Sequence, residues 1–498
     1  MIRHLAARSN SSLRRYLALP ACLALLALAC IGGNELRAKQ ARSSASSASG
    51  SDSAAPPAQP LASDWQPARE PAWGSERSDR GGPNLFAKLL DKSQLEIDQK
   101  VSTAVQRFFG VGTGEPAELI RKGGYRLYYE LPQDESMAFI WAADSNDVRS
   151  EGMSYGMMIA LQMNMPREFD RLWKFARTFM QYPADSPLVA WRHYFRWQGA
   201  VRPSGKQWQV SFGAETTPAP DGEEYFAAAL YLADRRWGST GEVNYRNEAA
   251  QITWAMLHNR PRDGRFPIIH QQADVVVFVP YQSSYEHSDP SYHVPAFYEL
   301  FAEYGPAMDA ERWRELAKHS RDFLVSSAHP SSGLHPDYAL FTGTPTQGYQ
   351  SSRHDEFYYD AWRVPLNLAL DQAWFGSDPR MKAQIEKYHA FFSGHLGDHN
   401  VASALFALDG SKPSGGGSTA LTATLAAGAL GSDAPNRKTY VENLWHVAQQ
   451  SGEWRYYQEC VYVLGLLATS GRYQYDWASA AETTGVAPTG AAPAGAAQ

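Results

Sequence analysis

Cysteine is nearly absent from this chain, which has 3 cysteines among 498 residues. Cys22 and Cys30 lie close to the N-terminus, and Cys460 stands alone far from both. A disulfide framework needs several cysteines in pairs, so the sequence implies no such framework. The body of the chain also has no block of consecutive basic residues, and the formal net charge is -6. We therefore expect no nucleic-acid partner.

The His-rich patches of the sequence could suggest a metal, but they lack a metal-binding histidine pattern. Residues 354–356 read His-Asp-Glu, without the helical His-x-x-x-His spacing that a zinc site would favour. We interpret these residues as a solvated loop. The sequence therefore predicts no metal site.

The N-terminus has the features of an export signal over residues 1–29. An apolar run over residues 17–29 follows four arginines, namely Arg3, Arg8, Arg14 and Arg15. The run is too short to span a bilayer comfortably, which makes a transmembrane anchor the second interpretation. A lipid on Cys30, directly after this run, would tether the mature protein to a membrane. We expect a periplasmic, secreted or lipid-anchored protein at the cell envelope, and a monomer.

Composition divides the remainder of the chain into three parts. Residues 30–83 are rich in Ser, Ala and Pro and should form a disordered tether, and residues 478–498 form a similar Ala/Gly/Pro tail. No comparable linker interrupts residues 84–477, which we interpret as one catalytic domain.

Helical patterns of two kinds dominate this domain. Residues 153–163, 225–233 and 460–468 are apolar all the way round, whereas residues 309–327 are apolar on one face only. Buried helices alternating with one-sided ones predict two concentric layers, as in an all-α (α/α)6 barrel. A helical solenoid would share much of this signature. Residues 189–220 mix aromatic residues with Gly and Pro and should form loops or a small β-hairpin at the mouth.

Three acids stand at the starts of predicted inner helices: Glu151, Asp221 and Asp360. Taken singly, each could simply favour a helix N-terminus, and Asp221 with Glu224 could form a capping pair. Taken together, three carboxyl groups at one end of an inner layer would repel as anions, which raises at least one pKa. Glycosidic bond cleavage needs one carboxylic acid and one carboxylate in this way.

Several motifs, in this order along the chain, resemble glycoside hydrolase family eight. They are residues 150–157 (SEGMSYGM), 219–226 (APDGEEYF), 288–295 (SDPSYHVP), 359–365 (YDAWRVP) and 454–457 (WRYY). The resemblance implies an (α/α)6 barrel and an inverting, cofactor-independent glycosidase for β-1,4-linked polymers. It also implies that Glu151 is the general acid, that Asp360 is the base that activates water, and that Asp221 grips the sugar. Tyr292 and Arg363 match residues that position the water or the base.

Within this family, the first two motifs are most similar to the branch that releases xylose from the reducing end of xylo-oligosaccharides. That branch has a late Leu-His-Pro element that blocks the cleft beyond the terminal sugar. Residues 408–418 lack this element, and the same tripeptide at residues 334–336 comes before Asp360 rather than after it. Internal cleavage of longer chains, through an open cleft, is therefore an alternative.

The aromatic content is high, with 15 Trp, 26 Tyr and 21 Phe. Aromatic rings fill cores and also form the platforms on which sugars stack, and we expect sugar contacts from Trp197 and Tyr457. The sequence predicts hydrolysis of xylan or xylo-oligosaccharides. The alternatives are a family-eight hydrolase of β-glucan or chitosan, and a noncatalytic carbohydrate-binding barrel.

Overall fold

The computed structural model describes residues 81–110, 124–204, 207–348 and 353–476. All of these residues belong to one compact unit, Gln59–Gln498. The predicted export signal, Cys30, almost all of the predicted tether and the predicted tail lie outside the described residues. Within the described part of the chain, no helix combines the length and the apolar character needed to cross a membrane.

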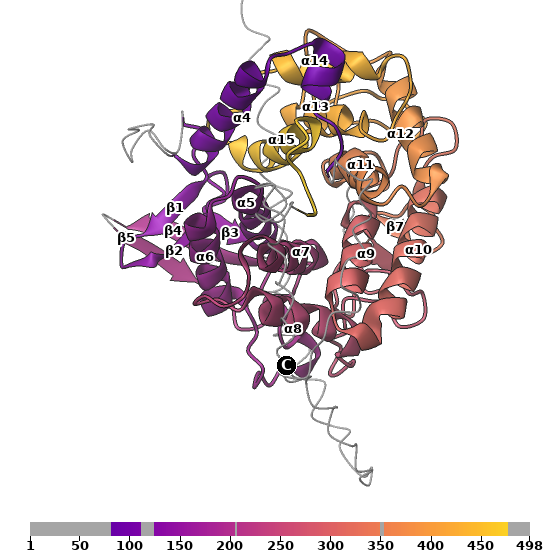
Figure 1. Ribbon diagram of the computed structural model, residues 1–498. Coiled ribbons are helices and arrows are strands. Elements are labelled where there is room, and N and C mark those ends of the chain that lie inside the picture. Colours follow the sequence, from indigo (N-terminus) through magenta and orange to yellow (C-terminus); the bar gives the residue numbers. More distant parts are fainter. Residues whose placement is uncertain (1–80, 111–123, 205–206, 349–352, 477–498) are drawn as a thin grey trace, which may run out of the picture. The chain divides into compact units, whose positions relative to one another are not determined.

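Six helices of the described chain form an inner layer (Figure 1). They are α5 (Ser150–Gln162), α7 (Pro220–Trp237), α9 (Pro295–Tyr304), α11 (Val364–Trp374), α13 (Thr419–Gly428) and α15 (Arg455–Thr469). Each contacts the next in this order, and α15 contacts α5, so the layer closes into a ring.

A second helix backs each inner helix on the outside (Figure 1). The outer helices are α4 (Gln94–Phe109), α6 (Pro166–Phe175), α8 (Tyr245–His258), α10 (Ala310–Ser327), α12 (Pro379–Phe392) and α14 (Arg437–His446), and the short α3 (Leu85–Leu90) packs on α14. This closed double ring is the predicted (α/α)6 barrel, and closure rules out the solenoid.

Burial follows the sequence pattern that predicted the two layers. All ten residues of α13 are buried, as are twelve of the thirteen in α5, whereas α10 buries one face through Trp313, Leu316 and Leu324. A helix that is apolar on every side finds apolar partners on every side only in an inner layer. The predictions for residues 153–163, 225–233, 460–468 and 309–327 are therefore confirmed.

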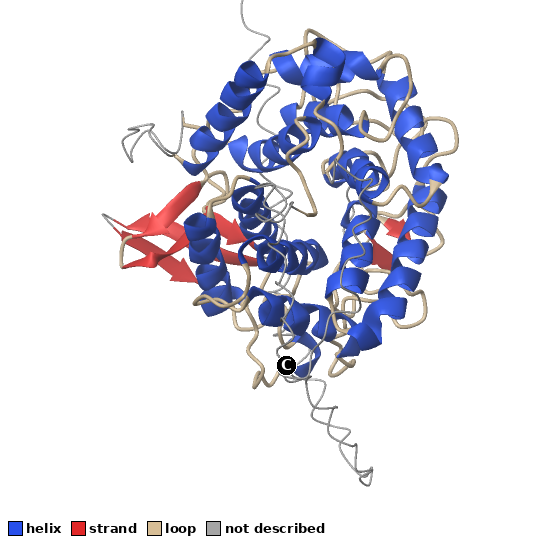
Figure 2. Cartoon of the chain, viewed as in Figure 1, coloured by secondary structure: helices blue, strands red, loops and turns tan. Residues whose placement is uncertain are grey.

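The strands are few and short, and they lie outside the inner ring (Figure 2). They pair as β1 (Tyr128–Leu131) with β2 (Asp134–Ile140), as β3 (Asp147–Arg149) with β4 (Gln198–Ser204) and β5 (Gln207–Ser211), and as β6 (His287–Ser288) with β7 (Ala339–Leu340). All of these pairs are antiparallel, and β4 with β5 forms the hairpin expected within residues 189–220.

Two of these pairings fix backbone next to the inner helices. Strand β3 runs directly into α5, and Arg149 at its end pairs with Gln198 of β4. The Ser150 N–H then donates to the Trp197 carbonyl at 2.9 Å, which fixes the start of α5. The pairing of β6 with β7 likewise brings the segment before Asp289 beside the segment after Asp337.

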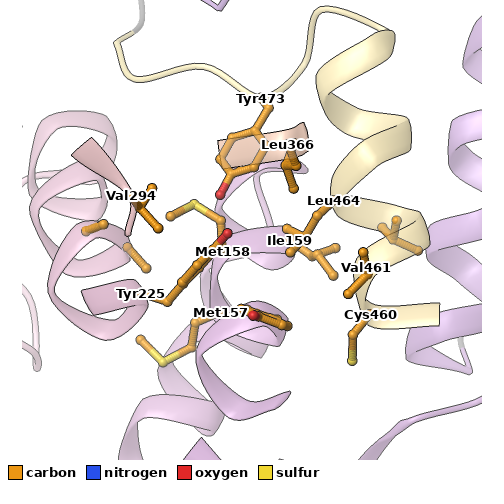
Figure 3. Close-up of a cluster of buried hydrophobic side chains, with 14 of the residues drawn as sticks. Met157, Met158, Ile159, Tyr225, Val294, Leu366, Cys460, Val461, Leu464 and Tyr473 are labelled. Atoms are coloured by element: carbon orange, nitrogen blue, oxygen red, sulfur yellow. The ribbon is translucent and has the colours of Figure 1, made fainter. Parts of the chain in front are cut away.

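The centre of the inner layer is apolar, as Figure 3 shows for Leu464, Ile159, Leu366 and neighbouring side chains. Leu464 is 1 % exposed, whereas Leu95 on α4 is 67 % exposed. We expect Leu464→Ala to lower the free energy of unfolding by about 2–5 kcal/mol, because it opens a cavity in a closely packed core. Urea unfolding measures this loss. Leu95→Ala is the control and should change stability by less than about 0.5 kcal/mol; equal effects would contradict this account of the core.

Candidate active site

The guanidinium of Arg363 is the meeting point of four carboxyl groups from distant parts of the chain. Its Nη1 donates to Glu151 Oε2 at 3.1 Å and to Asp221 Oδ2 at 2.9 Å, and its Nη2 donates to Asp289 Oδ2 at 3.3 Å and to Asp360 Oδ1 at 3.4 Å. The structure thus brings Glu151, Asp221 and Asp360 together, as the sequence predicted.

Each of the three predicted acids stands at the start of a helical segment. Glu151 and Asp221 occupy the second positions of α5 and α7, and Asp360 opens the 3-10 turn Asp360–Arg363 that leads into α11. Asp221 makes no cap with Glu224. Its Oδ1 accepts from the Gly222 N–H at 2.9 Å, and Glu224 instead accepts a hydrogen bond from the Tyr298 hydroxyl. The capping interpretation was therefore wrong.

A glycine follows two of these acids because the helix starts are crowded. A Cβ at Gly152 would lie 2.5 Å from the Tyr456 hydroxyl oxygen, and one at Gly222 would lie 2.5 Å from the Ser150 Cβ. Both contacts are far inside van der Waals distance. The Glu-Gly and Asp-Gly steps in the sequence therefore allow α5, α7 and α15 to approach closely at this end of the barrel.

Glu151 has two hydrogen-bond partners and little contact with solvent. Its side chain is 16 % exposed, Oε2 accepts from Arg363, and Oε1 accepts from the Tyr456 hydroxyl at 3.0 Å. Burial raises the pKa of Glu151, although the charges of Arg363 and Arg149 oppose it. Burial prevails over these two charges.

The other carboxyl groups around Arg363 differ in how far water can reach them. Asp289 is fully buried and Asp221 is 5 % exposed, whereas Asp360 is 30 % exposed. Burial raises the pKa of Asp221 to about 7, and burial together with the Asp360 charge raises the pKa of Asp289. Four ionised carboxylates around one guanidinium would leave a large uncompensated charge, so some of them retain protons.

Three tyrosines that lie within the quoted motifs surround Arg363. The Tyr292 and Tyr457 rings lie 5.4 Å and 6.0 Å from its Cζ, and the Tyr155 hydroxyl accepts from Nη1 at 3.1 Å. Tyr457 also donates its hydroxyl to the Tyr359 carbonyl at 2.7 Å. Tyr292 and Tyr457 are thus neighbours of the carboxyl cluster.

Trp197 is placed beside this cluster by its backbone. Its carbonyl accepts from the Ser150 N–H, one residue before Glu151, and its side chain is partly buried. Contact of Trp197 or Tyr457 with a sugar stays a prediction.

Sequence reasoning missed several residues at the site. Asp289, Tyr155 and Tyr456 all lie within the quoted motifs, so their positions were marked although their contacts were not. Asp337 and His354 lie outside those motifs. The His354 Nδ1 is 3.2 Å from Asp337 Oδ2, and its side chain is 21 % exposed, so the interpretation of residues 354–356 as solvated loop was wrong for His354.

One group in the described part of the chain has metal-ligand spacing. A polar atom of each of Asp337, His354 and Asp360 lies within 4.8 Å of the other two. Asp337 and His354 already share a hydrogen bond, and Asp360 faces the cation of Arg363. We therefore interpret this group as a hydrogen-bonded cluster and not as a metal centre.

The arrangement of the cluster suits acid–base catalysis. One carboxyl group with a raised pKa and a second, more exposed carboxyl group lie on different nitrogens of the same guanidinium. Glycosidic cleavage with inversion uses two carboxyl groups spaced to admit a water molecule.

Comparison with known proteins agrees with this chemistry. The model of glycosyl hydrolases family 8 matches residues 140–471. Reducing-end xylose-releasing exo-oligoxylanase Rex8A of Paenibacillus barcinonensis is 38% identical over 354 residues, which cover 70% of this chain and 87% of that protein. The reducing end xylose-releasing exo-oligoxylanase of Bifidobacterium adolescentis is 34% identical over 405 residues, 79% of this chain and 97% of that protein.

Solved structures give the same result for the fold. The crystal structure of a GH8 xylobiose complex from Teredinibacter turnerae superposes with a TM-score of 0.70 at 37% identity. The superposition covers 79% of this chain and 98% of that one. The family match and these relatives span most of the domain that carries the carboxyl cluster, and the chain therefore belongs to glycosyl hydrolases family 8.

Proposed function

We propose that this inverting glycoside hydrolase cleaves β-1,4-xylosidic bonds in xylo-oligosaccharides or xylan, with Glu151 as general acid and Asp360 as general base. The observation that carries the assignment is the convergence of Glu151, Asp221 and Asp360 on the Arg363 guanidinium. The substrate class is supported by the relatives, which are exo-oligoxylanases, and by a xylobiose complex of a related structure.

The two carboxyl groups differ in the way that the reaction requires. Glu151 holds a proton to higher pH because burial disfavours its anion, so it can protonate the leaving glycosidic oxygen. Asp360, the most exposed of the four carboxyl groups, can accept a proton from the water that attacks the anomeric carbon from the opposite face. Attack by water in a single displacement inverts the configuration at that carbon.

Asp221 and Arg363 complete the proposed machinery. Asp221 is held by Arg363 and by the Gly222 N–H, so its carboxyl group has a fixed direction in the site. We assign to it the role of gripping the sugar at the point of cleavage. Arg363, which contacts both the acid and the base, fixes their separation.

Replacing Glu151 by Gln removes the proposed proton donor while keeping the shape of the side chain. We expect kcat on xylohexaose to fall by about 10²- to 10⁴-fold, because general acid catalysis contributes that much. Reducing-sugar release measures the rate. Glu311→Gln changes a glutamate in the first turn of outer helix α10 that is 79 % exposed, and it should retain full activity. Near-normal turnover by the Glu151 variant would reject the assignment.

The alkaline limb of the pH profile should report Glu151, because a general acid must be protonated to act. Activity is present below the raised pKa of Glu151 and is lost as pH rises through it. Since the Arg149 charge lowers this pKa, Arg149→Gln should move the alkaline limb of kcat/KM to higher pH. A limb that stays in place or moves to lower pH would contradict this role for Glu151.

Product analysis distinguishes terminal from internal cleavage. The relatives release xylose from the reducing end, and we propose the same for this chain, although residues 408–418 lack the Leu-His-Pro element. The tripeptide at residues 334–336 does not replace it, because Leu334 and His335 are fully buried and His335 bonds to Tyr388 and the Leu324 carbonyl.

With xylobiose to xylohexaose labelled at the reducing end, terminal action gives xylose as the only labelled product at early times, together with the unlabelled oligosaccharide that is one sugar shorter. Longer labelled fragments would mean internal cleavage through an open cleft. Early products with the β-configuration retained would instead contradict the inverting mechanism.

A further inference from the structure

A buried carboxyl group and a histidine lie directly behind the proposed base. Asp337 is 1 % exposed, and its Oδ1 accepts from the Ala361 N–H at 3.0 Å, one residue after Asp360. Its Oδ2 lies 3.2 Å from His354 Nδ1. Asp337 therefore connects the imidazole of His354 to the backbone that carries Asp360.

Backbone pairing and ring stacking hold His354 in place. The Tyr338 N–H donates to the His354 carbonyl at 2.8 Å, and the Asp337 N–H donates to the Glu356 carbonyl at 3.1 Å. The imidazole stacks on the Tyr338 ring with centroids 4.1 Å apart and an interplanar angle of 22°. Side-chain polar atoms of His354, Asp337 and Asp360 consequently all lie within 4.8 Å of one another.

Carboxyl groups outnumber cations around Asp360 and His354. The charged or titratable groups that face Asp360 or His354 are Glu151, Asp221, Asp289, Asp337, Asp355, Arg363, His287, Tyr292, Tyr338 and Tyr457. Arg363 is the cation among them, and it is shared by four carboxyl groups. A protonated His354 would supply a second cation next to Asp360.

The surroundings of His354 favour its protonated form. Burial lowers the pKa of His354, but the hydrogen bond to Asp337 and the charges of Asp337, Asp360 and Asp355 raise it above its ordinary value. Burial and the Asp360 charge raise the pKa of Asp337 to about 7, with His354 opposing them.

We propose that Asp337 and His354 are positioning residues for the base: Asp337 fixes the backbone after Asp360, and the bond to Asp337 holds the His354 imidazolium as a positive charge beside the Asp360 carboxylate. This inference rests on the proposed role of Asp360. His354 would be a second cation next to Asp360. Arg363, the first, is shared among four carboxyl groups.

The kinetic test compares His354→Gln with the wild type in the pH dependence of kcat/KM on xylohexaose. Removing this cation leaves the carboxyl cluster with more uncompensated negative charge, which favours proton uptake by the cluster, so the acid limb should move up by about 1 pH unit. The alkaline limb should stay in place. The double variant Asp337→Asn/His354→Gln removes both opposite charges and should return the acid limb toward the wild-type position. Lower activity with unmoved limbs would mean a merely structural role and would overturn the proposal.

The chain offers a matched control pair away from the site. His258 on α8 has its Nε2 2.9 Å from Asp309 Oδ1, with side chains 22 % and 6 % exposed, close to the values for His354 and Asp337. His258→Gln should leave both limbs of the profile unchanged. An equal acid-limb shift in this variant would show that the effect is not local to Asp360, and would likewise overturn the proposal.

A measurement without substrate separates this proposal from the proposed function. The imidazole NMR signal of His354, assigned by its loss in His354→Gln, should titrate at lower pH in Asp360→Asn than in the wild type, because a neighbouring negative charge is gone. If His354 titrates at the same pH in Asp360→Asn as in the wild type, the proposed interaction of His354 with Asp360 is wrong, even if the enzyme is active. Failure of the wild type to cleave xylo-oligosaccharides would reject the proposed substrate. The NMR titration would still test the interaction between His354 and Asp360, because it needs no substrate.

Discussion

The bonds from the Arg363 guanidinium to four carboxyl groups are the interaction on which the site depends. Burying four carboxyl groups together is unfavourable unless a cation compensates them and some of them keep protons. Arg363 is the compensating cation, and the raised pKa values of Glu151, Asp221 and Asp289 allow carboxyl groups of the cluster to keep protons. The same arrangement that makes the cluster tolerable in the fold thus also produces one proton donor and one accessible carboxylate.

The barrel brings the acids of this cluster together and fixes the backbone around them. Glu151 and Asp221 open two inner helices, and Asp360 opens the turn before a third, so that ring closure brings them to one place. Short strand pairs outside the ring fix the intervening backbone, as β3 and β4 do before Glu151 and β6 and β7 do beside Asp289. The apolar inner layer keeps Glu151, Asp221 and Asp289 at low exposure, which is why burial dominates their pKa values.

Sequence reasoning predicted the features that local pattern determines. Helices apolar on every side had to be inner helices, and Glu151, Asp221 and Asp360 were recognisable by their place before such helices. It missed Asp289 as an Arg363 partner, although the residue lies in a quoted motif, because which side chain faces a distant guanidinium depends on tertiary packing. It also misjudged His354, since a His-Asp-Glu run gives no sign of its contact with Asp337, which lies 17 residues earlier. Neither residue belongs to a periodic pattern.

The contact between the last inner helix and the first has a consequence for biosynthesis. Tyr456 of α15 donates its hydroxyl to Glu151 of α5, and the two residues are 305 positions apart. A ribosome-bound chain that lacks α15 has neither the closed ring nor this partner for Glu151. The site can therefore assemble only after nearly the whole domain has emerged from the ribosome, and folding depends on a contact of very long sequence separation, which is slow to form.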